Sequence, residues 1–295
     1  MTRHGDTEGS EHVRGLVLTL SGVIALSPDA LLIRLITADT WTILWWRGLL
    51  MGIGLMVFVG VRHGRGTADA FRAMGRVGWL SVPLFAGSTI LFVTSLGLTT
   101  VANTLVIVAV APLFAAVFSR LFLGERIPGR TWAAIIASTA GVAAIFSGSL
   151  GGGALAGDLC AVATAACLAG HLVVARRCRA ASVLPAVAVS AFVVCAVSTL
   201  GGSPFDVTAR DFAYLMLSGL IVMPVSLGLI TAGPRYLPAA EVALIMLLET
   251  VLGPLWVWMA VGEIPARATF LGGTVILATL AAHSIAGLRK DSGRF

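Results

Sequence analysis

Charge is scarce in this chain. Only 12% of the 295 residues are charged, whereas 58% are hydrophobic, and a soluble domain carries roughly 25% charged residues. A soluble protein could not bury that much apolar surface, so the composition excludes a soluble globular protein and favours one embedded in a lipid bilayer. The connections between apolar runs are short, which leaves no stretch long enough for a separate soluble domain.

Lysine is nearly absent as well, since Lys290 stands against 19 arginines. No GxxxxGK[ST] loop exists, so the chain does not bind ATP by that route. The motifs HExxH and GxSxG are also missing, which argues against a hydrolase, and the four cysteines show no CxxC spacing. We therefore expect no enzyme, no cofactor and no metal site. The arginines lie in loops between apolar runs, a pattern that indicates membrane topology and not nucleic-acid binding.

What the sequence has in abundance is long apolar runs, ten in all. Each is close to the roughly 20 residues that a helix needs to cross about 30 Å of hydrocarbon. They cover residues 16–35, 41–61, 77–98, 101–123, 131–150, 154–175, 183–202, 212–232, 239–261 and 268–288. We therefore predict an all-α polytopic membrane protein with ten transmembrane helices.

Loop arginines orient these predicted spans. With the amino terminus placed in the cytoplasm, 16 Lys and Arg side chains fall on the cytoplasmic side, and three fall outside (Arg34, Arg210 and Arg267). Cytoplasmic loops of membrane proteins carry the excess of positive charge. The bias predicts that both termini are cytoplasmic, in a multi-pass protein of the cell (inner) membrane whose surroundings are the lipid bilayer.

The two halves of the chain share one design. The segment 109–130 reads AVAPLFAAVFSRLFLGERIPGR, and about 138 residues later the segment 247–267 reads LLETVLGPLWVWMAVGEIPAR. Gly124 and Gly262 hold matching places, each followed by Glu. We predict two five-helix repeats, 16–150 and 151–288, between cytoplasmic tails 1–15 and 289–295. Because five is odd, the second repeat inserts upside down, as in many secondary transporters.

These paired features resemble the EamA-type domains of the drug/metabolite transporter superfamily. Each half has a small-residue helix entry, a long apolar helix with Pro112 or Glu249 midway, a Gly-Glu pair at its end and a Gly/Ala-rich last helix. In the second half the helix kink is expected lower, near Pro254. The resemblance implies a secondary carrier, most often an exporter of amino acids, metabolites or drugs. A channel or scaffold and, less favoured, a membrane-embedded enzyme are the alternatives.

Among the charged candidate site residues, Glu249 is predicted to lie deepest in the membrane. It lies ten residues into the predicted ninth span, about 15 Å along the helix and so at the membrane midplane. An ionisable group there is expensive unless it is paired or wetted, and such groups are usually functional. We expect either proton coupling or contact with a cationic substrate, against the alternative of a packing role.

Asp29 and Arg47 form a second constellation. Each lies six residues from the outer end of its predicted span, on neighbouring antiparallel helices, which places both about 9 Å below the outer surface. We predict that they form an ion pair, which would relieve the cost of burying each charge. The pair could be a structural clamp or an outer gate.

A few more polar residues complete the predicted site. Asn103, Ser88 and Thr94 are the polar candidates for a mostly apolar cavity, and His171, near a cytoplasmic helix end, is a candidate proton carrier or an interfacial contact. Such a lining favours amino acids and drug-like molecules over sugar phosphates. Trp256 and Trp258 are expected in the aromatic belt at the membrane surface. The sequence leaves the substrate, the coupling ion and the oligomeric state open.

Overall fold

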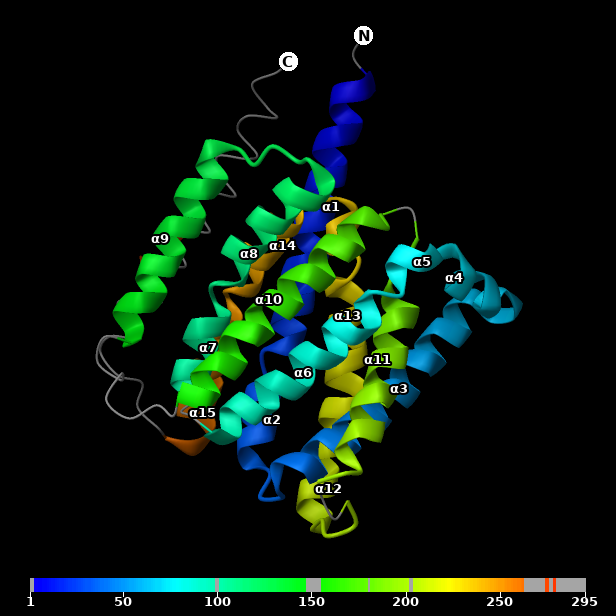
Figure 1. Cartoon of the computed structure of the whole chain (residues 1–295), viewed down its shortest axis with the longest axis vertical. Helices are drawn as coiled ribbons and strands as arrows, with labels where there is room; N and C mark the ends of the chain where they lie inside the picture. Colours follow the sequence, from blue (N-terminus) through cyan, green and yellow to red (C-terminus); the bar gives the residue numbers. More distant parts are fainter. Residues whose placement is uncertain are drawn as a thin grey trace.

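Figure 1 shows the computed structural model of the chain, a bundle of helices joined by short connections. The structure describes residues 3–98, 101–146, 155–179, 181–201, 204–262, 274–275 and 278–279. No strand occurs in these ranges, so the predicted all-helical fold class is confirmed for the described part of the chain.

The first predicted repeat contains the helical elements α1 (Arg3–Leu26), α2 (Asp29–Leu35), α3 (Thr40–His63), η1 (Gly64–Gly66), α4 (Thr67–Ala73), α5 (Gly75–Gly78), α6 (Ser81–Leu98), α7 (Val101–Val108), α8 (Ala111–Phe118), η2 (Ser119–Leu123) and α9 (Gly129–Phe146). The second contains α10 (Leu155–Arg177), α11 (Leu184–Ser198), α12 (Ala209–Met216), η3 (Leu217–Val222), α13 (Met223–Ile230), η4 (Gly233–Arg235), α14 (Ala239–Met246) and α15 (Glu249–Val261).

Six helical stretches of the described residues are long and apolar enough to cross a membrane: Glu11–Leu35, Thr40–Ala73, Gly75–Leu98, Leu155–Arg177, Ala209–Arg235 and Ala239–Ala260. Ala111–Leu123 and Leu184–Ser198 are shorter apolar helices. Most of the predicted tenth span, 268–288, lies outside the described residues. The predicted amino-terminal tail 1–15 is helical from Arg3 onward.

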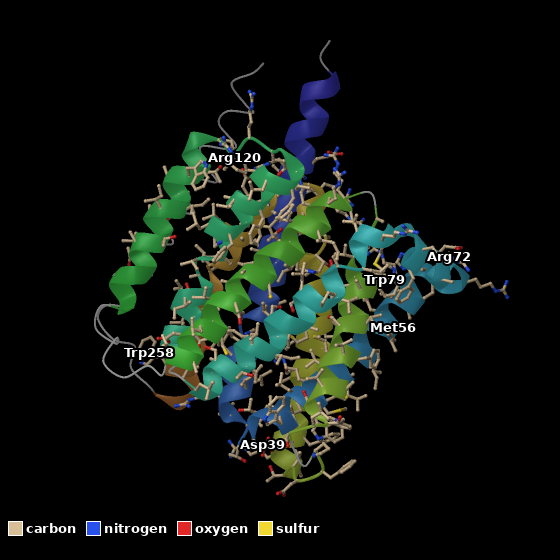
Figure 2. All side chains as sticks on the ribbon, in the orientation of Figure 1. Asp39, Met56, Arg72, Trp79, Arg120 and Trp258 are labelled. Atoms are coloured by element: carbon tan, nitrogen blue, oxygen red, sulfur yellow. The ribbon has the colours of Figure 1, made fainter. Side chains whose placement is uncertain are left out.

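Successive long helices run in alternating directions between two ends of the molecule (Figure 1). We call these the α1 end, where α1 begins, and the α12 end, where α12 lies. In Figure 2, Arg120 lies at the α1 end and Asp39 at the α12 end. Asp39 is the N-cap of α3 there, because its carboxylate accepts hydrogen bonds from the backbone N–H groups of Trp41 and Thr42. Burial favours a higher pKa for Asp39, but these hydrogen bonds outweigh it and hold the pKa below its ordinary value.

Three long helical stretches are interrupted in the middle. α1 gives way to α2 at Ser27–Pro28, α7 to α8 at residues 109–110, and α14 to α15 at residues 247–248. α15 continues through Pro254, so the stretch is not interrupted at the residue near which the kink was expected. The interruption lies higher, where the backbone N–H groups of Leu247 and Leu248 bond to carbonyls three residues back and Thr250 donates to the Leu247 carbonyl. These shorter bonds satisfy the backbone groups that the break would otherwise expose.

The second and third interruptions match residue for residue at a sequence offset of 138. α7 and α14 begin at Val101 and Ala239 and end at Val108 and Met246. The helices that follow the breaks end at Gly124 and Gly262, which have φ values of 66° and 76°. Glycine adopts this left-handed conformation without the steric cost that other residues incur. The matching sequence segments therefore have matching local backbone structure.

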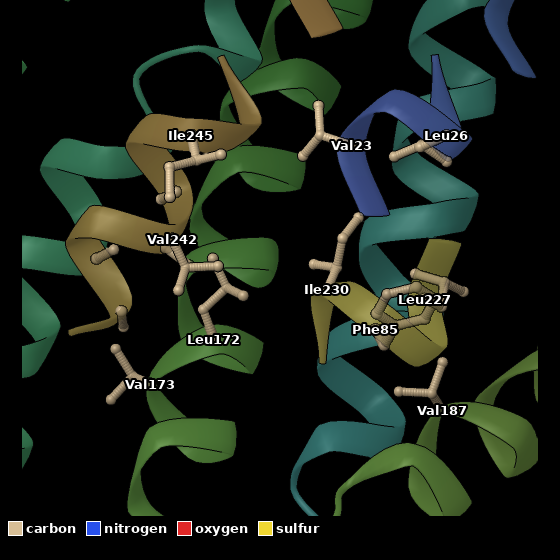
Figure 3. Packing of buried hydrophobic residues seen from close by; sticks show 14 of the residues in the cluster. Val23, Leu26, Phe85, Leu172, Val173, Val187, Leu227, Ile230, Val242 and Ile245 are labelled. Carbon is tan, nitrogen blue, oxygen red and sulfur yellow. The ribbon is translucent and has the colours of Figure 1, made fainter. Parts of the chain in front are cut away.

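The helices pack around a continuous apolar core. Figure 3 shows part of it, where Val23 of α1 and Leu172 of α10 are buried with Ile230 of α13 and Val242 of α14. Elements far apart in sequence therefore share one core, and it surrounds the level at which the helices break.

Close helix packing depends on glycine at one contact. A Cβ at Gly48 of α3 would lie 2.7 Å from both the Ala191 carbonyl oxygen and the Cys195 backbone nitrogen of α11. Gly60, on the same helix, has nothing within 4 Å of its corresponding position. The two sites therefore differ in packing and not in secondary structure.

We expect Gly48→Ala to destabilise the protein by about 1–3 kcal/mol, because α3 and α11 must move apart to admit the methyl group. Gly60→Ala is the control, and it should leave stability unchanged or raise it through helix propensity. Thermal unfolding of the two purified variants in detergent measures this. Equal unfolding midpoints for both would contradict the packing account.

Candidate functional site

A central cavity of about 140 Å³ lies where the three helix interruptions meet. Leu26 and Asp29 flank the first interruption, Ala109 lies in the second, and Leu247 lies in the third, which Glu249 follows; all of them line the cavity. Broken helices expose backbone groups and helix termini inside a membrane protein only where these line a cavity or contact other protein groups. The fold therefore concentrates polar groups at this one place.

The predicted ion pair between Asp29 and Arg47 is present and buried. Arg47 Nη1 donates to Asp29 Oδ1 at 2.7 Å, and Arg47 Nη2 donates to Asp29 Oδ2 at 2.6 Å. Both side chains are 6% exposed and both line the cavity. Two parallel bonds of this kind fix the relative orientation of the guanidinium and the carboxylate. The pair joins the start of α2 to the middle of α3.

Ser218, a residue that was not predicted from the sequence, hydrogen-bonds to both members of the pair and so connects them to a third element. Its hydroxyl donates to Asp29 Oδ1 at 2.6 Å, and it accepts from Arg47 Nη1 at 3.1 Å. Ser218 lies in η3, a π-helical segment directly before α13, whose second residue is Pro224. Proline lacks an N–H and crowds the carbonyl four residues back, which favours a local widening of the helix upstream. Pro224 is the sequence signal that could have pointed to this segment.

Glu249 occupies the first turn of α15 and also lines the cavity. α15 packs against α2, and Glu249 interacts electrostatically with both charges of the pair, repelled by Asp29 and attracted by Arg47. Asp29 and Glu249 both lie in the first turn of a helix, where the helix dipole favours a negative group. Asp29 is paired with Arg47, and Glu249 is the other carboxyl group among the residues that line the cavity.

Trp256 ties two of the interruptions together. Its indole Nε1–H donates to Ser27 Oγ at 2.8 Å, and Ser27 Oγ donates to the Ile24 carbonyl. Trp256 is 38% exposed, in agreement with the surface position expected for it. Its hydrogen bond to Ser27 was not indicated by the sequence. The contact links the break before α2 to α15, the helix that begins with Glu249.

The other predicted site residues are divided between the cavity and its surroundings. Ser88 lines the cavity and donates to the Phe85 carbonyl at 2.8 Å. Thr94 is half-buried on α6 and is not among the lining residues of this cavity. His171 is 2% exposed and packs edge-on against Phe85, with ring centroids 5.0 Å apart, so the interfacial contact considered for it is wrong. Asn103 lies on α7, and its side chain is outside the described part of the structure.

A second cavity, of about 180 Å³, continues from the first toward the α12 end. The two share Asp29, Phe92 and Glu249 among their lining residues. Arg34 and Thr40 line the second cavity farther out, at the end of α2 and the start of α3. The charged groups of the central cavity thus lie beside a route to the α12 end.

At the α1 end an ion pair connects the two halves of the chain. Arg176, in the last turn of α10, donates from Nε to Glu125 Oε1 at 2.9 Å. Its Nη1 donates to the Pro234 carbonyl at 3.2 Å. Glu125 follows the left-handed Gly124, whose conformation turns the chain there. In the sequence, Glu125 stands out only as part of a repeated Gly-Glu motif, which gives no indication of its partner.

We expect Arg47→Met to cost about 3–5 kcal/mol of stability, because it leaves the Asp29 carboxylate buried without a partner. The double variant D29N/R47M should recover part of that loss. The control is Arg72→Met, since Arg72 and Asp69 form an ion pair with side chains 80% and 77% exposed, and such pairs contribute about 0–1 kcal/mol. Thermal or chemical unfolding in detergent measures all three. Equal stability of R47M and R72M would contradict this account of the pair.

Comparison with known proteins finds a family match in the first half of the chain and a shared fold over most of it. Residues 13–147 match the EamA-like transporter family. A protein of known crystal structure matches 93% of this chain and 98% of its own length, with a TM-score of 0.78 and 16% sequence identity, which indicates a shared fold. No curated protein sequence matches the chain. The predicted resemblance is confirmed for the first half: residues 13–147 match a family described as EamA-like transporters.

Proposed function

We propose that the chain is a secondary transporter that exports small organic molecules by alternating access. The observation that carries the proposal is the central cavity, at which three broken helices meet and which Glu249 and the Asp29–Arg47 pair line. Secondary transporters commonly bind substrate near the midplane, at discontinuous helices whose ends point into the site. Ionisable residues inside a membrane protein commonly mark the pathway of a substrate or an ion.

We further propose ten spans arranged as two inverted repeats, residues 16–150 and 151–288. The offset of 138 that relates α7 and α14, the breaks after them and the left-handed glycines Gly124 and Gly262 supports this arrangement. Each repeat then contributes one broken helix of this kind to the central cavity. In that arrangement the site lies at the repeat interface, where rocking of one repeat against the other would expose it to each side in turn.

The lining of the cavity favours an amphipathic substrate that carries a cationic group. Its apolar wall includes Phe85, Phe92, Leu105, Met223 and Met246. Glu249 supplies a carboxylate for an amine, since Asp29 is neutralised by Arg47. Amino acids and amine-containing drug-like molecules combine such a group with an apolar part. We propose these classes, with proton coupling through Glu249.

The two ends of the site support an outward-open or occluded state. The second cavity extends from the site toward the α12 end, which we assign to the outside on the arginine bias of the loops. At the α1 end the Glu125–Arg176 pair holds the loop before α9 against the end of α10. Opening toward the cytoplasm would require this contact to break. The Asp29–Arg47 pair would then act at the outer side of Glu249.

The alternative is a channel or a scaffold without coupled transport. Reconstitution into proteoliposomes, with uptake measured for panels of amino acids and cationic drugs, distinguishes the possibilities. A carrier shows saturable uptake that depends on a gradient, and it exchanges labelled for unlabelled substrate. Uptake that rises linearly with concentration indicates a channel, and no uptake of any compound argues for a scaffold.

We expect Glu249→Gln to exchange substrate across the membrane but to lose at least about tenfold of its pH-driven accumulation, because glutamine keeps the shape and cannot carry a proton. Asp69→Asn, at an exposed carboxylate, is the control. Uptake into proteoliposomes with and without a pH gradient measures both. Unchanged pH dependence in E249Q would leave Glu249 as a substrate contact or a packing residue.

We also expect both termini to lie in the cytoplasm, given the bias of 16 to 3 in Lys and Arg. A reporter that is active only in the cytoplasm should work when fused after Phe295, and one that is active only outside should not. A second fusion in the connection at residues 199–208, near the α12 end, should show the opposite pattern. The reverse result at either site would overturn the assigned orientation.

A further inference from the structure

A third cavity, larger than the two described above, lies on the outer surface of the helix bundle, between α6, η2 and α10. It has a volume of about 610 Å³ and is separate from the central cavity. Its lining is apolar except at one end, where Arg177 closes it. We call it the α6–α10 groove.

The groove has a floor of small residues and walls of large ones. Ala166, Cys167 and Gly170 of α10 form the floor. Leu80 on one side and Phe122 on the other are 54% and 72% exposed. This shape accommodates a narrow apolar chain that lies along α10.

The length of the groove corresponds to one leaflet of a bilayer. Ala166 and Arg177 are 11 positions apart on one continuous helix, which is about 16 Å at 1.5 Å per residue. Half of a hydrocarbon core of about 30 Å is about 15 Å. The apolar part of the groove therefore matches one leaflet in length, and an apolar chain lying in it would place its polar end beside Arg177.

Arg177 is positioned to bind an anion there. Its side chain is exposed, and it forms no ion pair within the described residues. The α1 end is the side that we assign to the cytoplasm, so this step rests on the proposed orientation. Basic pockets between helices on that side bind the headgroups of anionic lipids.

We propose that the α6–α10 groove is a binding site for an anionic phospholipid of the cytoplasmic leaflet. One acyl chain lies along Ala166, Gly170 and Val174, and the phosphate accepts hydrogen bonds from the Arg177 guanidinium. A second copy of the chain fits the groove less well. In a two-fold symmetric dimer both copies would present the same arginine at the interface, and a helix about 10 Å wide would not reach a floor made by single small residues.

Native mass spectrometry of the purified full-length protein tests the proposal. The protein is exchanged from vesicles of phosphatidylcholine and phosphatidylglycerol into detergent, and the retained lipid is identified and counted. We expect one retained phosphatidylglycerol. Arg177→Gln should lower its retention about fivefold, the effect of losing one arginine near the headgroups. The matched control is Arg179→Gln, at an exposed arginine two residues farther along that does not line the groove.

A second variant tests the apolar part without touching the charge. Ala166→Leu fills the floor and should lower retention of phosphatidylglycerol and of phosphatidylcholine alike, while both variants keep the monodisperse elution of the parent protein. Equal retention in R177Q and R179Q would overturn the proposal, and so would a dimer that loses lipid only when it dissociates. Because no transport is measured, failure here leaves the proposed transport function untouched, and loss of transport leaves the lipid site untouched.

Discussion

The buried pair of Asp29 and Arg47 is the interaction on which the rest of the site depends. An unpaired charge at this depth would cost several kcal/mol, so each residue is tolerated only while the other holds it. The two bonds of the pair, together with Ser218, join α2, α3 and η3 at one point. This cluster fixes the start of α2, and α2 in turn packs against α15, the helix that begins with Glu249.

Helix interruptions explain why polar groups gather at this level of the fold. In hydrocarbon every backbone group needs a partner, so a break is stable only where neighbouring groups or a cavity supply one. The breaks at Ser27–Pro28, at residues 109–110 and at residues 247–248 meet at the same cavity. Each break also starts a new helix, and two of these new helices carry an acidic residue in the first turn. The helix dipole stabilises the ionised form of a carboxylate at such a position, so these breaks provide places where the fold tolerates a buried negative charge.

Much of this arrangement follows from the sequence, and the rest does not for a physical reason. Apolar length predicted the helices, and equal depth on adjacent helices predicted the Asp29–Arg47 pair. The sequence indicated a kink near Pro254 but not the break before Glu249, because a proline signals a weak point and not the residue at which the backbone bonds shorten. Ser218, the Trp256–Ser27 bond and the Glu125–Arg176 pair were missed because they join residues 51 to 229 positions apart. Only the packing of the helices brings such residues together.

The central claim is that the cavity at the helix breaks opens to each side of the membrane in turn. The most direct measurement replaces the four native cysteines and introduces Thr250→Cys, since Thr250 lines the cavity beside Glu249. A thiol reagent that cannot cross the membrane is then added to whole cells or to inverted vesicles. The account predicts labelling from both sides, with substrate protecting the cysteine. Labelling from one side alone, or from neither, would contradict it.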